Sequence, residues 1–146
     1  MKVGDKIPSF SLKNEQGEMV NSNDFVGKPM VIYFYPKDDT PGCTKEACAF
    51  RDNFEDFTDA GITVFGISAD DEASHLAFQQ KYRLPFSLLS DTENKVRKKW
   101  KVPTDLFGLL PGRVTYAIDE MGKIKHIFKS QLKVEQHVKE ALESLV

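Results

Sequence analysis

Five apolar runs along the chain predict the strands of a central sheet. Met30–Tyr35 and Ile62–Ile67 are continuous and rich in β-branched and aromatic residues, which is typical of central strands covered on both faces. Phe86–Leu89 is a shorter run of the same kind. Val114–Ile118 and Ile124–Phe128 are separated by a turn that contains glycine, and this arrangement predicts a β-hairpin.

Apolar residues at three- and four-residue spacing predict the helices between these strands. The first expected helix runs from Pro41 to Gly61, and the last runs from Val134 to Leu145. Of the two helices between them, one begins at a cap at Asp70 or Asp71 and the other at a cap at Thr92. Two short runs at 10–12 and 18–20 precede them and predict a small N-terminal hairpin, followed by a helical turn over 21–25.

The order of these elements, β-α-β-α-β-α-β-β-α after a hairpin, is typical of an α/β fold with a mixed central sheet and flanking helices. The pattern contains no internal repeat and no linker. We therefore expect one domain that spans residues 1–146.

Composition and charge narrow the classes of partner. The net charge is −2, which argues against nucleic acid or an anionic membrane as the main partner. No apolar stretch approaches the length of a membrane span, and the first residues, Met1–Asp5, lack the apolar run of a signal peptide. These features predict a cytoplasmic protein.

The most informative local pattern places Cys43 in the first turn of a helix. Thr40 is a good N-cap, and Pro41 suits the first helical position because its missing N–H and fixed φ cost nothing there. Cys43 then lies beneath the unpaired N–H groups at the positive end of the helix dipole. A thiol in this position should ionise more easily, which favours a nucleophile.

Four interpretations of the pair Cys43 and Cys48 are open. A metal site needs about four ligands, and the histidines at 75, 126 and 137 show no suitable spacing to the pair. A hydrolase would need a histidine base, for which no local cue exists. Inert buried thiols are the third interpretation. Redox chemistry, with one cysteine attacking and the other resolving, is the interpretation that the helix start favours.

The spacing of the two cysteines adds a conformational requirement. In one regular helix a separation of five residues puts their Cα atoms about 8–9 Å apart, beyond the limit of about 7 Å for a disulfide. A bond between them therefore requires the start of the helix to unwind, at a cost of a few kcal/mol.

Several motifs resemble those of a known family. Pro36-x-x-x-Thr40-x-x-Cys43 resembles the active-site signature of the peroxiredoxins, and the longer run Phe34–Cys48 is similar to the Q-type subfamily, also called bacterioferritin comigratory proteins. Asp105–Arg113 resembles the same subfamily, and the similarity extends from Gly4 to the last helix.

This resemblance implies a thioredoxin-like fold in its peroxiredoxin variant, and a peroxidase that needs no metal, haem or flavin. Cys43 would be the peroxidatic cysteine, and Arg113 would stabilise its thiolate. Thr40 would hydrogen-bond the thiolate and the peroxide, while Pro36 would shield the site from water. Cys48 would resolve the sulfenic acid of Cys43 into an intramolecular disulfide, which thioredoxin or a similar dithiol would reduce. An internal disulfide also favours a monomer.

Two other functions stay open from the residues alone. A general dithiol–disulfide oxidoreductase, or a redox sensor or chaperone without enzymatic turnover, could use the same cysteine pair.

The remaining polar groups are expected on the surface, namely the three histidines, Asp38-Asp39 and Arg97-Lys98-Lys99. Glu46 is favoured by the helix dipole, and orienting Arg113 is its less favoured role. The apolar residues of 106–110 are expected in the core, or else as an apolar rim that suits bulky hydroperoxides or the reducing protein.

Overall fold

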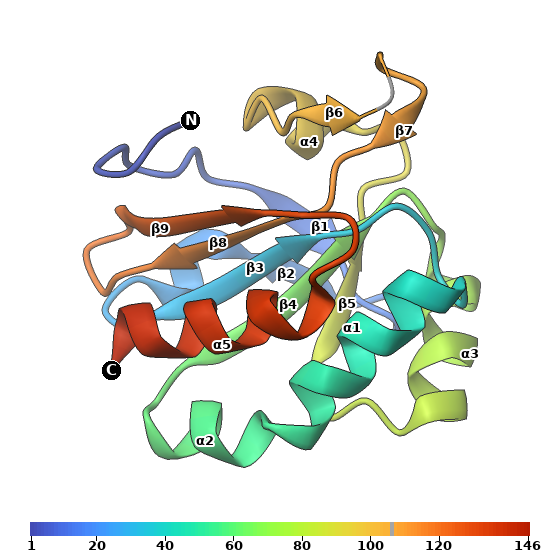
Figure 1. Ribbon diagram of the computed structural model, residues 1–146, viewed down its shortest axis with the longest axis horizontal. Coiled ribbons are helices and arrows are strands. Elements are labelled where there is room, and N and C mark those ends of the chain that lie inside the picture. The colour runs from blue at the N-terminus through green and yellow to red at the C-terminus, as the bar shows by residue number, and fades with distance from the viewer. Residues whose placement is uncertain (106) are drawn as a thin grey trace.

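The computed structural model describes residues 1–105 and 107–146 and contains a seven-stranded mixed sheet in the order β2-β1-β5-β4-β3-β8-β9 (Figure 1). The strands are β1 (Ser11–Lys13), β2 (Met19–Asn21), β3 (Met30–Phe34), β4 (Thr63–Ser68), β5 (Ser87–Ser90), β8 (Val114–Ile118) and β9 (Ile124–Lys129). β3, β4 and β5 are parallel, whereas β8 pairs antiparallel with β3 and β9. The N-terminal hairpin joins the sheet through β5.

Both faces of the sheet are covered, as the continuous apolar strands predict. The helices are η1 (Ser22–Phe25), α1 (Pro41–Asp52), α2 (Phe54–Asp59), α3 (Glu72–Tyr82), α4 (Lys95–Lys99) and α5 (Val134–Leu145). Alternate residues of β3 point to opposite faces: Tyr33 packs in the core beneath α1 and α5, while Phe34 packs with Trp100 beside α4. α5 lies against α1, β8 and β9 (Figure 1).

The expected helix from Pro41 to Gly61 is two helices, α1 and α2, separated at Asn53. The amide of Asn53 donates to the carbonyl oxygen of Ala49 at 2.8 Å, and its backbone leaves the helical region with φ −108° and ψ 9°. A short amide side chain that bonds the backbone of the preceding turn competes with the helical ladder. The apolar spacing that predicts one helix continues across this break.

The expected cap at Thr92 is also wrong. α4 begins at Lys95, and the carboxylate of Asp91 accepts the backbone N–H groups of Val96 at 3.1 Å and Arg97 at 2.9 Å. The sequence pattern did not predict the short hairpin of β6 (Thr104–Asp105) and β7 (Leu110–Pro111), which lies beside α4 (Figure 1). None of the helices among the described residues is long and apolar enough to cross a membrane.

Candidate active site

Cys43 lies in the first turn of α1, where the chain leaves the carboxyl end of β3. Its side chain is buried, with 1% of its surface exposed. α1 begins at Pro41 as the sequence predicts, and the N–H of Thr44 donates to the carbonyl of Thr40 at 2.8 Å. Open α/β sheets present their ligand sites at this edge, so the position suits a reactive group.

Arg113, just before β8, brings a cation to this thiol from 70 residues further along the chain. Its Nη2 lies 3.3 Å from Sγ of Cys43, and the side chain is buried. Gly42 leaves room for the guanidinium, since a Cβ at this position would lie 3.0 Å from Nη2. Gly112 is required for a similar reason, because a Cβ there would lie 1.9 Å from the carbonyl oxygen of Pro103.

Glu46, one turn after Cys43 on α1, holds the other side of the guanidinium. Its Oε1 accepts from Nη1 of Arg113 at 2.8 Å, and both side chains are almost fully buried. Burial raises the pKa of Glu46 to about 7, although the charge and hydrogen bond of Arg113 act in the opposite direction. Burial lowers the pKa of Arg113, but Glu46 and Cys43 outweigh this effect, and its pKa is raised above the ordinary value. The guanidinium therefore stays charged between the carboxyl group of Glu46 and the thiol of Cys43.

Comparison with known proteins decides the family. The sequence profile of the AhpC/TSA family matches residues 3–127. Chloroplastic peroxiredoxin Q of Triticum aestivum is 57% identical over 139 residues, which cover 95% of this chain and 64% of that protein. Its counterpart in Populus jackii is 56% identical, with 97% of this chain and 67% of that protein covered. The chain belongs to the AhpC/TSA family, among the Q-type peroxiredoxins. It spans about two thirds of the length of these relatives.

Solved peroxiredoxin structures share the fold. Peroxidoxin BcpB from Mycobacterium tuberculosis superposes with a TM-score of 0.91 at 34% identity, over 99% of this chain and 96% of that one. Xanthomonas campestris bacterioferritin comigratory protein, whose structures concern alkyl peroxide reduction activity, gives 0.84 at 29% identity, over 93% of this chain and 89% of that one. The thioredoxin-like fold implied by the motifs is thus confirmed.

The predicted cytoplasmic location is contradicted by these relatives, because both peroxiredoxin Q proteins are chloroplastic. The prediction used the lack of an apolar run near Met1. Such a run marks secretory export, whereas transit to a plastid depends on amphipathic, Ser-rich and Arg-rich segments, so the criterion did not bear on this compartment.

The remaining peroxiredoxin signature residues surround the start of α1. Pro36 is partly buried just after β3. Thr40 takes the N-cap position, but its hydroxyl accepts no backbone N–H of α1 and instead donates to the carbonyl of Lys37 at 2.9 Å. Cys48 is partly buried on α1, and both cysteine thiols are free. The two cysteines therefore lie in one helix, the arrangement for which the sequence predicts unwinding before a disulfide forms.

The expectation that the histidines lie on the surface is wrong for two of them. His137 of α5 is fully buried: its Nε2 donates to the carbonyl of Ser130 at 2.7 Å, and Thr115 donates to its Nδ1 at 2.8 Å. Burial lowers the pKa of His137 to about 4. Its Nδ1 lies 3.6 Å from Oε2 of Glu46, which links α5 to the active site. His75 is also fully buried, whereas His126 is half-buried beside Glu140.

The two charged runs expected on the surface are each partly buried. Asp38 is buried and Asp39 is exposed; Arg97 is buried, while the two lysines that follow it are exposed. Arg97 donates to the carbonyl of Gly112 at 3.0 Å, beside Arg113. Only the fold brings the carbonyl of Gly112 to this guanidinium. No local pattern in the sequence could therefore have shown that Arg97 is buried while the two lysines after it are exposed.

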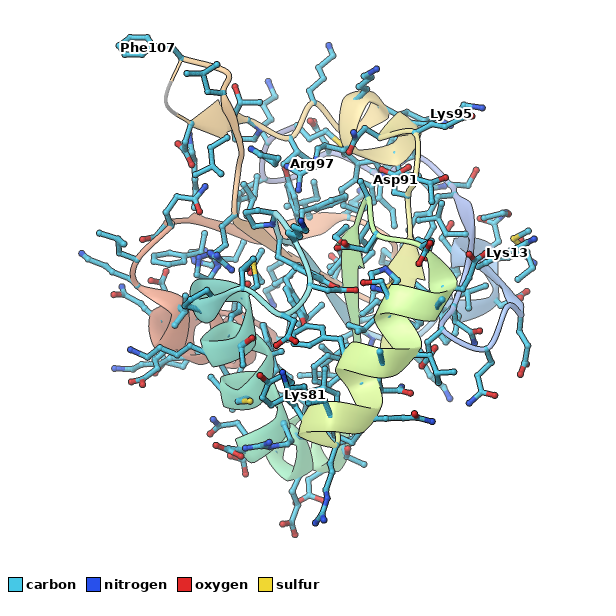
Figure 2. All side chains as sticks on the ribbon, turned by 90° about the vertical axis from the view of Figure 1, so that its right-hand side faces the viewer. Lys13, Lys81, Asp91, Lys95, Arg97 and Phe107 are labelled. Carbon is cyan, nitrogen blue, oxygen red and sulfur yellow. The ribbon has the colours of Figure 1, made fainter. Side chains whose placement is uncertain are left out.

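The described apolar residues before Arg113 do not belong to the core. Phe107 is fully exposed at the end of the β6–β7 hairpin, where it points away from the body of the protein (Figure 2), and 85% of Leu109 is exposed. Leu106 lies outside the described residues. A groove of about 330 Å³ beneath the hairpin is lined by Leu109, Val102, Arg97 and neighbouring residues. Cys43 is not among the described residues that line it.

Proposed function

We propose that this protein is a thiol-dependent peroxidase in which the thiolate of Cys43 attacks a peroxide. The observation that carries the proposal is the guanidinium of Arg113 at 3.3 Å from a buried thiol at the start of a helix. The arrangement offers a cation and backbone N–H groups to a sulfur anion, and donors to the oxygen that leaves. The peroxiredoxin Q relatives support the same chemistry by their names.

The first step is a displacement on oxygen. The sulfur of Cys43 attacks one oxygen of ROOH, the O–O bond breaks, and the leaving alkoxide takes up a proton to give ROH. Cys43 is oxidised to the sulfenic acid as the peroxide is reduced. Arg113 stabilises the thiolate before the attack and the developing negative charge on oxygen during it.

The second step uses Cys48. With the first turn of α1 unwound, the thiolate of Cys48 attacks the sulfur of the sulfenic acid, and the leaving hydroxide takes up a proton to form water. The resulting Cys43–Cys48 disulfide is then reduced by an external dithiol, for which we propose thioredoxin or a protein of similar chemistry. We propose hydrogen peroxide and organic hydroperoxides as substrates, the latter because the Xanthomonas campestris relative is described for alkyl peroxide reduction. Since all sulfur chemistry occurs within one chain, a monomer suffices.

A coupled assay tests this function. Reduced protein with thioredoxin, thioredoxin reductase and NADPH should consume NADPH only when peroxide is added, and Cys43→Ser should abolish this consumption. Reduction of insulin disulfides without peroxide would instead indicate a general dithiol–disulfide oxidoreductase. A single oxidation without turnover would indicate a redox sensor. Either of these two results would overturn the proposal.

A further inference from the structure

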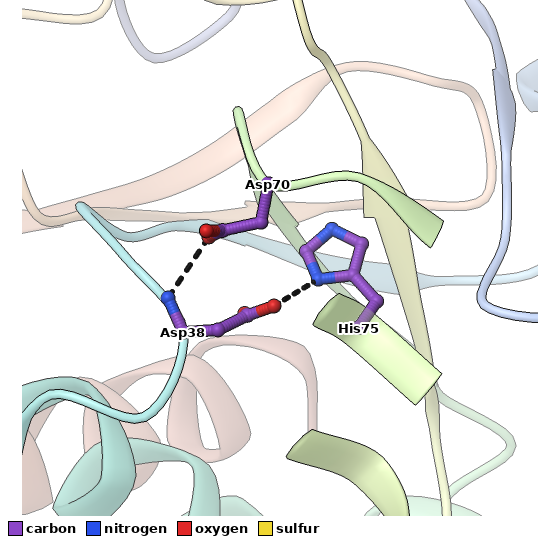
Figure 3. Close-up of side chains that lie close together, drawn as sticks. All are labelled: Asp38, Asp70 and His75. Carbon is purple, nitrogen blue, oxygen red and sulfur yellow. Dashed lines mark hydrogen bonds and ion pairs between the residues drawn. The ribbon is translucent and has the colours of Figure 1, made fainter. Parts of the chain in front are cut away.

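A buried group of side chains fixes the loop that leads into α1. Asp38, in the middle of this loop (residues 35–40), accepts three hydrogen bonds on its carboxylate. Nδ1 of His75 lies 2.7 Å from its Oδ2 (Figure 3), the hydroxyl of Ser74 donates to the same oxygen at 2.8 Å, and the hydroxyl of Tyr35 donates to Oδ1 at 2.6 Å. The backbone N–H of Asp38 donates to Asp70 at 2.9 Å. The loop is thereby tied to α3 and to the residues after β4.

Both ring nitrogens of His75 face acceptors. Nδ1 faces the carboxylate of Asp38, and Nε2 lies 3.0 Å from the carbonyl oxygen of Leu89 in β5. A carbonyl can only accept, so Nε2 carries a proton. The contact of 2.7 Å between Nδ1 and Oδ2 requires a second proton between these two atoms.

The other donors place this second proton on the ring. Burial and the charge of Asp38 raise the pKa of Tyr35 well above its ordinary value, so its hydroxyl keeps its proton and donates to the carboxylate. Together with Ser74, it stabilises the ionised form of Asp38. Two hydroxyl donors suit a carboxylate that only accepts, and the shared proton then belongs to Nδ1 of the ring. The pair is a cation and an anion, with 0% and 3% of the side chains exposed.

The same three side chains, Asp38, Asp70 and His75, are close enough to surround a metal ion, since one ligand atom from each lies within 4.8 Å of the others. Hydrogen bonds already use them, however. Both carboxylate oxygens of Asp38 accept from protein donors, and Asp70 accepts from Ser68 at 2.6 Å as well as from the backbone of Asp38. A metal would have to displace these donors, so the cluster is better explained as a structural ion pair.

We propose that His75, with a proton on each ring nitrogen, is a positioning residue that acts through Asp38, holding the loop with Pro36 and Thr40 in place while the first turn of α1 unwinds. The proposal rests on the function proposed above for Cys43. The ion pair lies on the N-terminal side of Thr40, and its partners are in α3, in β5 and at Tyr35 directly after β3, outside the part of α1 that must unwind. The loop can therefore keep its shape through both steps of the cycle.

The proton count of His75 can be measured without any activity. In NMR spectra of reduced protein with ¹⁵N-labelled histidine at neutral pH, we expect both ring nitrogens of His75 to carry protons. His137 serves as an internal reference, because its Nδ1 accepts from Thr115 and only its Nε2 should be protonated. The spectrum of His75→Asn assigns the signals. A single protonated nitrogen in His75 would overturn the proposal, whether or not the protein reduces peroxide.

Two isosteric variants test the positioning role. In His75→Asn the amide nitrogen can take the place of Nδ1 and still donate to Asp38. In His75→Gln the amide nitrogen takes the place of Nε2 and donates to the carbonyl of Leu89, so the hydrogen bond to Asp38 is lost. We expect His75→Gln to slow the oxidation of Cys43 by hydrogen peroxide about tenfold to a hundredfold, and His75→Asn to restore much of this rate. The rate of disulfide formation after oxidation should change less, because it depends on unwinding of α1.

Lys81→Ala provides a matched control on the same loop. It breaks an exposed ion pair of 2.8 Å between Lys81 of α3 and Asp39, the neighbour of Asp38, and should leave both rates unchanged. A His75→Gln protein that folds and oxidises at the wild-type rate would overturn the positioning role. An equal loss of the Cys43 oxidation rate in His75→Asn and His75→Gln would also overturn the positioning role. Failure of wild-type protein to react with peroxide would instead overturn the proposed function. The NMR measurement would still test the proton count of His75, because it needs no activity.

Discussion

Glu46 and Arg113 form a buried ion pair, with 2.8 Å between Oε1 and Nη1, that orients the guanidinium toward Cys43. The pair joins the first turns of α1 to the start of β8. A buried carboxylate that fixes an arginine leaves little freedom for the other guanidinium nitrogens, so Nη2 meets the sulfur in a defined position. The role that sequence analysis ranked second for Glu46 is the one its contacts support.

Removal of the guanidinium should slow the first oxidation. Arg113→Ala takes away the only group outside α1 that donates to the sulfur among the described residues, and we expect the rate of peroxide attack to fall by about 10²-fold or more. Stopped-flow mixing of reduced protein with hydrogen peroxide measures this rate. Lys45→Ala is the matched control, because it removes an exposed cation two residues from Cys43 and should have little effect. An Arg113→Ala rate equal to that of wild type would show that the guanidinium takes no part.

Glu46 should make the protein less stable as the pH rises. Its pKa is about 7 in the folded protein against an ordinary 4.5, so the folded state binds more protons between these values and loses stability as the pH increases. Comparison with Glu46→Gln isolates this effect. We expect the free energy of unfolding of wild type minus that of the variant to fall by about 3 kcal/mol from pH 4.5 to 7, as measured by urea titration. A constant difference would show that Glu46 does not titrate in this range.

His137 should have the opposite dependence. Its pKa is about 4 in the folded protein against an ordinary 6.5, so the unfolded state binds more protons between these values and stability rises with pH. The difference between wild type and His137→Gln should therefore increase by about 3 kcal/mol from pH 4 to 6.5. The effects of Glu46 and His137 have opposite signs over nearly the same pH range, so each is measured against its own variant. A His137→Gln profile parallel to wild type would contradict the burial of a neutral histidine here.

Oxidation should unwind the start of α1 and leave the preceding loop in place. Cys43 and Cys48 belong to one helix in the reduced protein, and a disulfide between them is incompatible with regular helical geometry. Hydrogen exchange should be faster in the oxidised protein for amides 43–48 and unchanged for α3. Equal protection of α1 in both redox states would contradict the requirement for unwinding.

Phe107 should not affect the choice of peroxide. The apolar-rim hypothesis predicts that Phe107→Ser raises KM for a bulky hydroperoxide more than for hydrogen peroxide. The side chain instead points into solvent (Figure 2), and the groove below the hairpin is lined by residues of α4, β7 and their neighbours. We expect equal KM values for wild type and variant with cumene hydroperoxide. A selective increase for this substrate would restore the rim hypothesis.

The local sequence pattern was sufficient to predict those elements of the fold that depend on residues close to one another in the sequence. The continuous apolar runs predicted β3 and β4, and the Thr-Pro sequence predicted where α1 begins. The family motif, in turn, identified Arg113 as the partner of Cys43, 70 residues away, and the structure places these two side chains together. By contrast, the break at Asn53 depends on one side-chain bond that apolar spacing does not reveal.

The buried polar groups could not be predicted because their partners are distant in the chain. His75 meets Asp38 across 37 residues, and His137 meets Thr115 across 22. A lone histidine in a polar stretch gives no sign of such a partner, and the usual expectation is exposure. The fold supplies acceptors and donors on several elements at once, and this allows these groups to be buried.

The central claim is that Cys43, beside Arg113, is the sulfur that attacks peroxide. Rapid mixing of the reduced Cys48→Ser variant with one equivalent of hydrogen peroxide, followed by trapping and mass spectrometry, tests it most directly. We predict a sulfenic acid on Cys43, formed at the wild-type rate and persisting because no resolving thiol is present. Loss of the reaction in Cys48→Ser, with Cys48 as the sulfur first oxidised in wild type, would contradict the assignment.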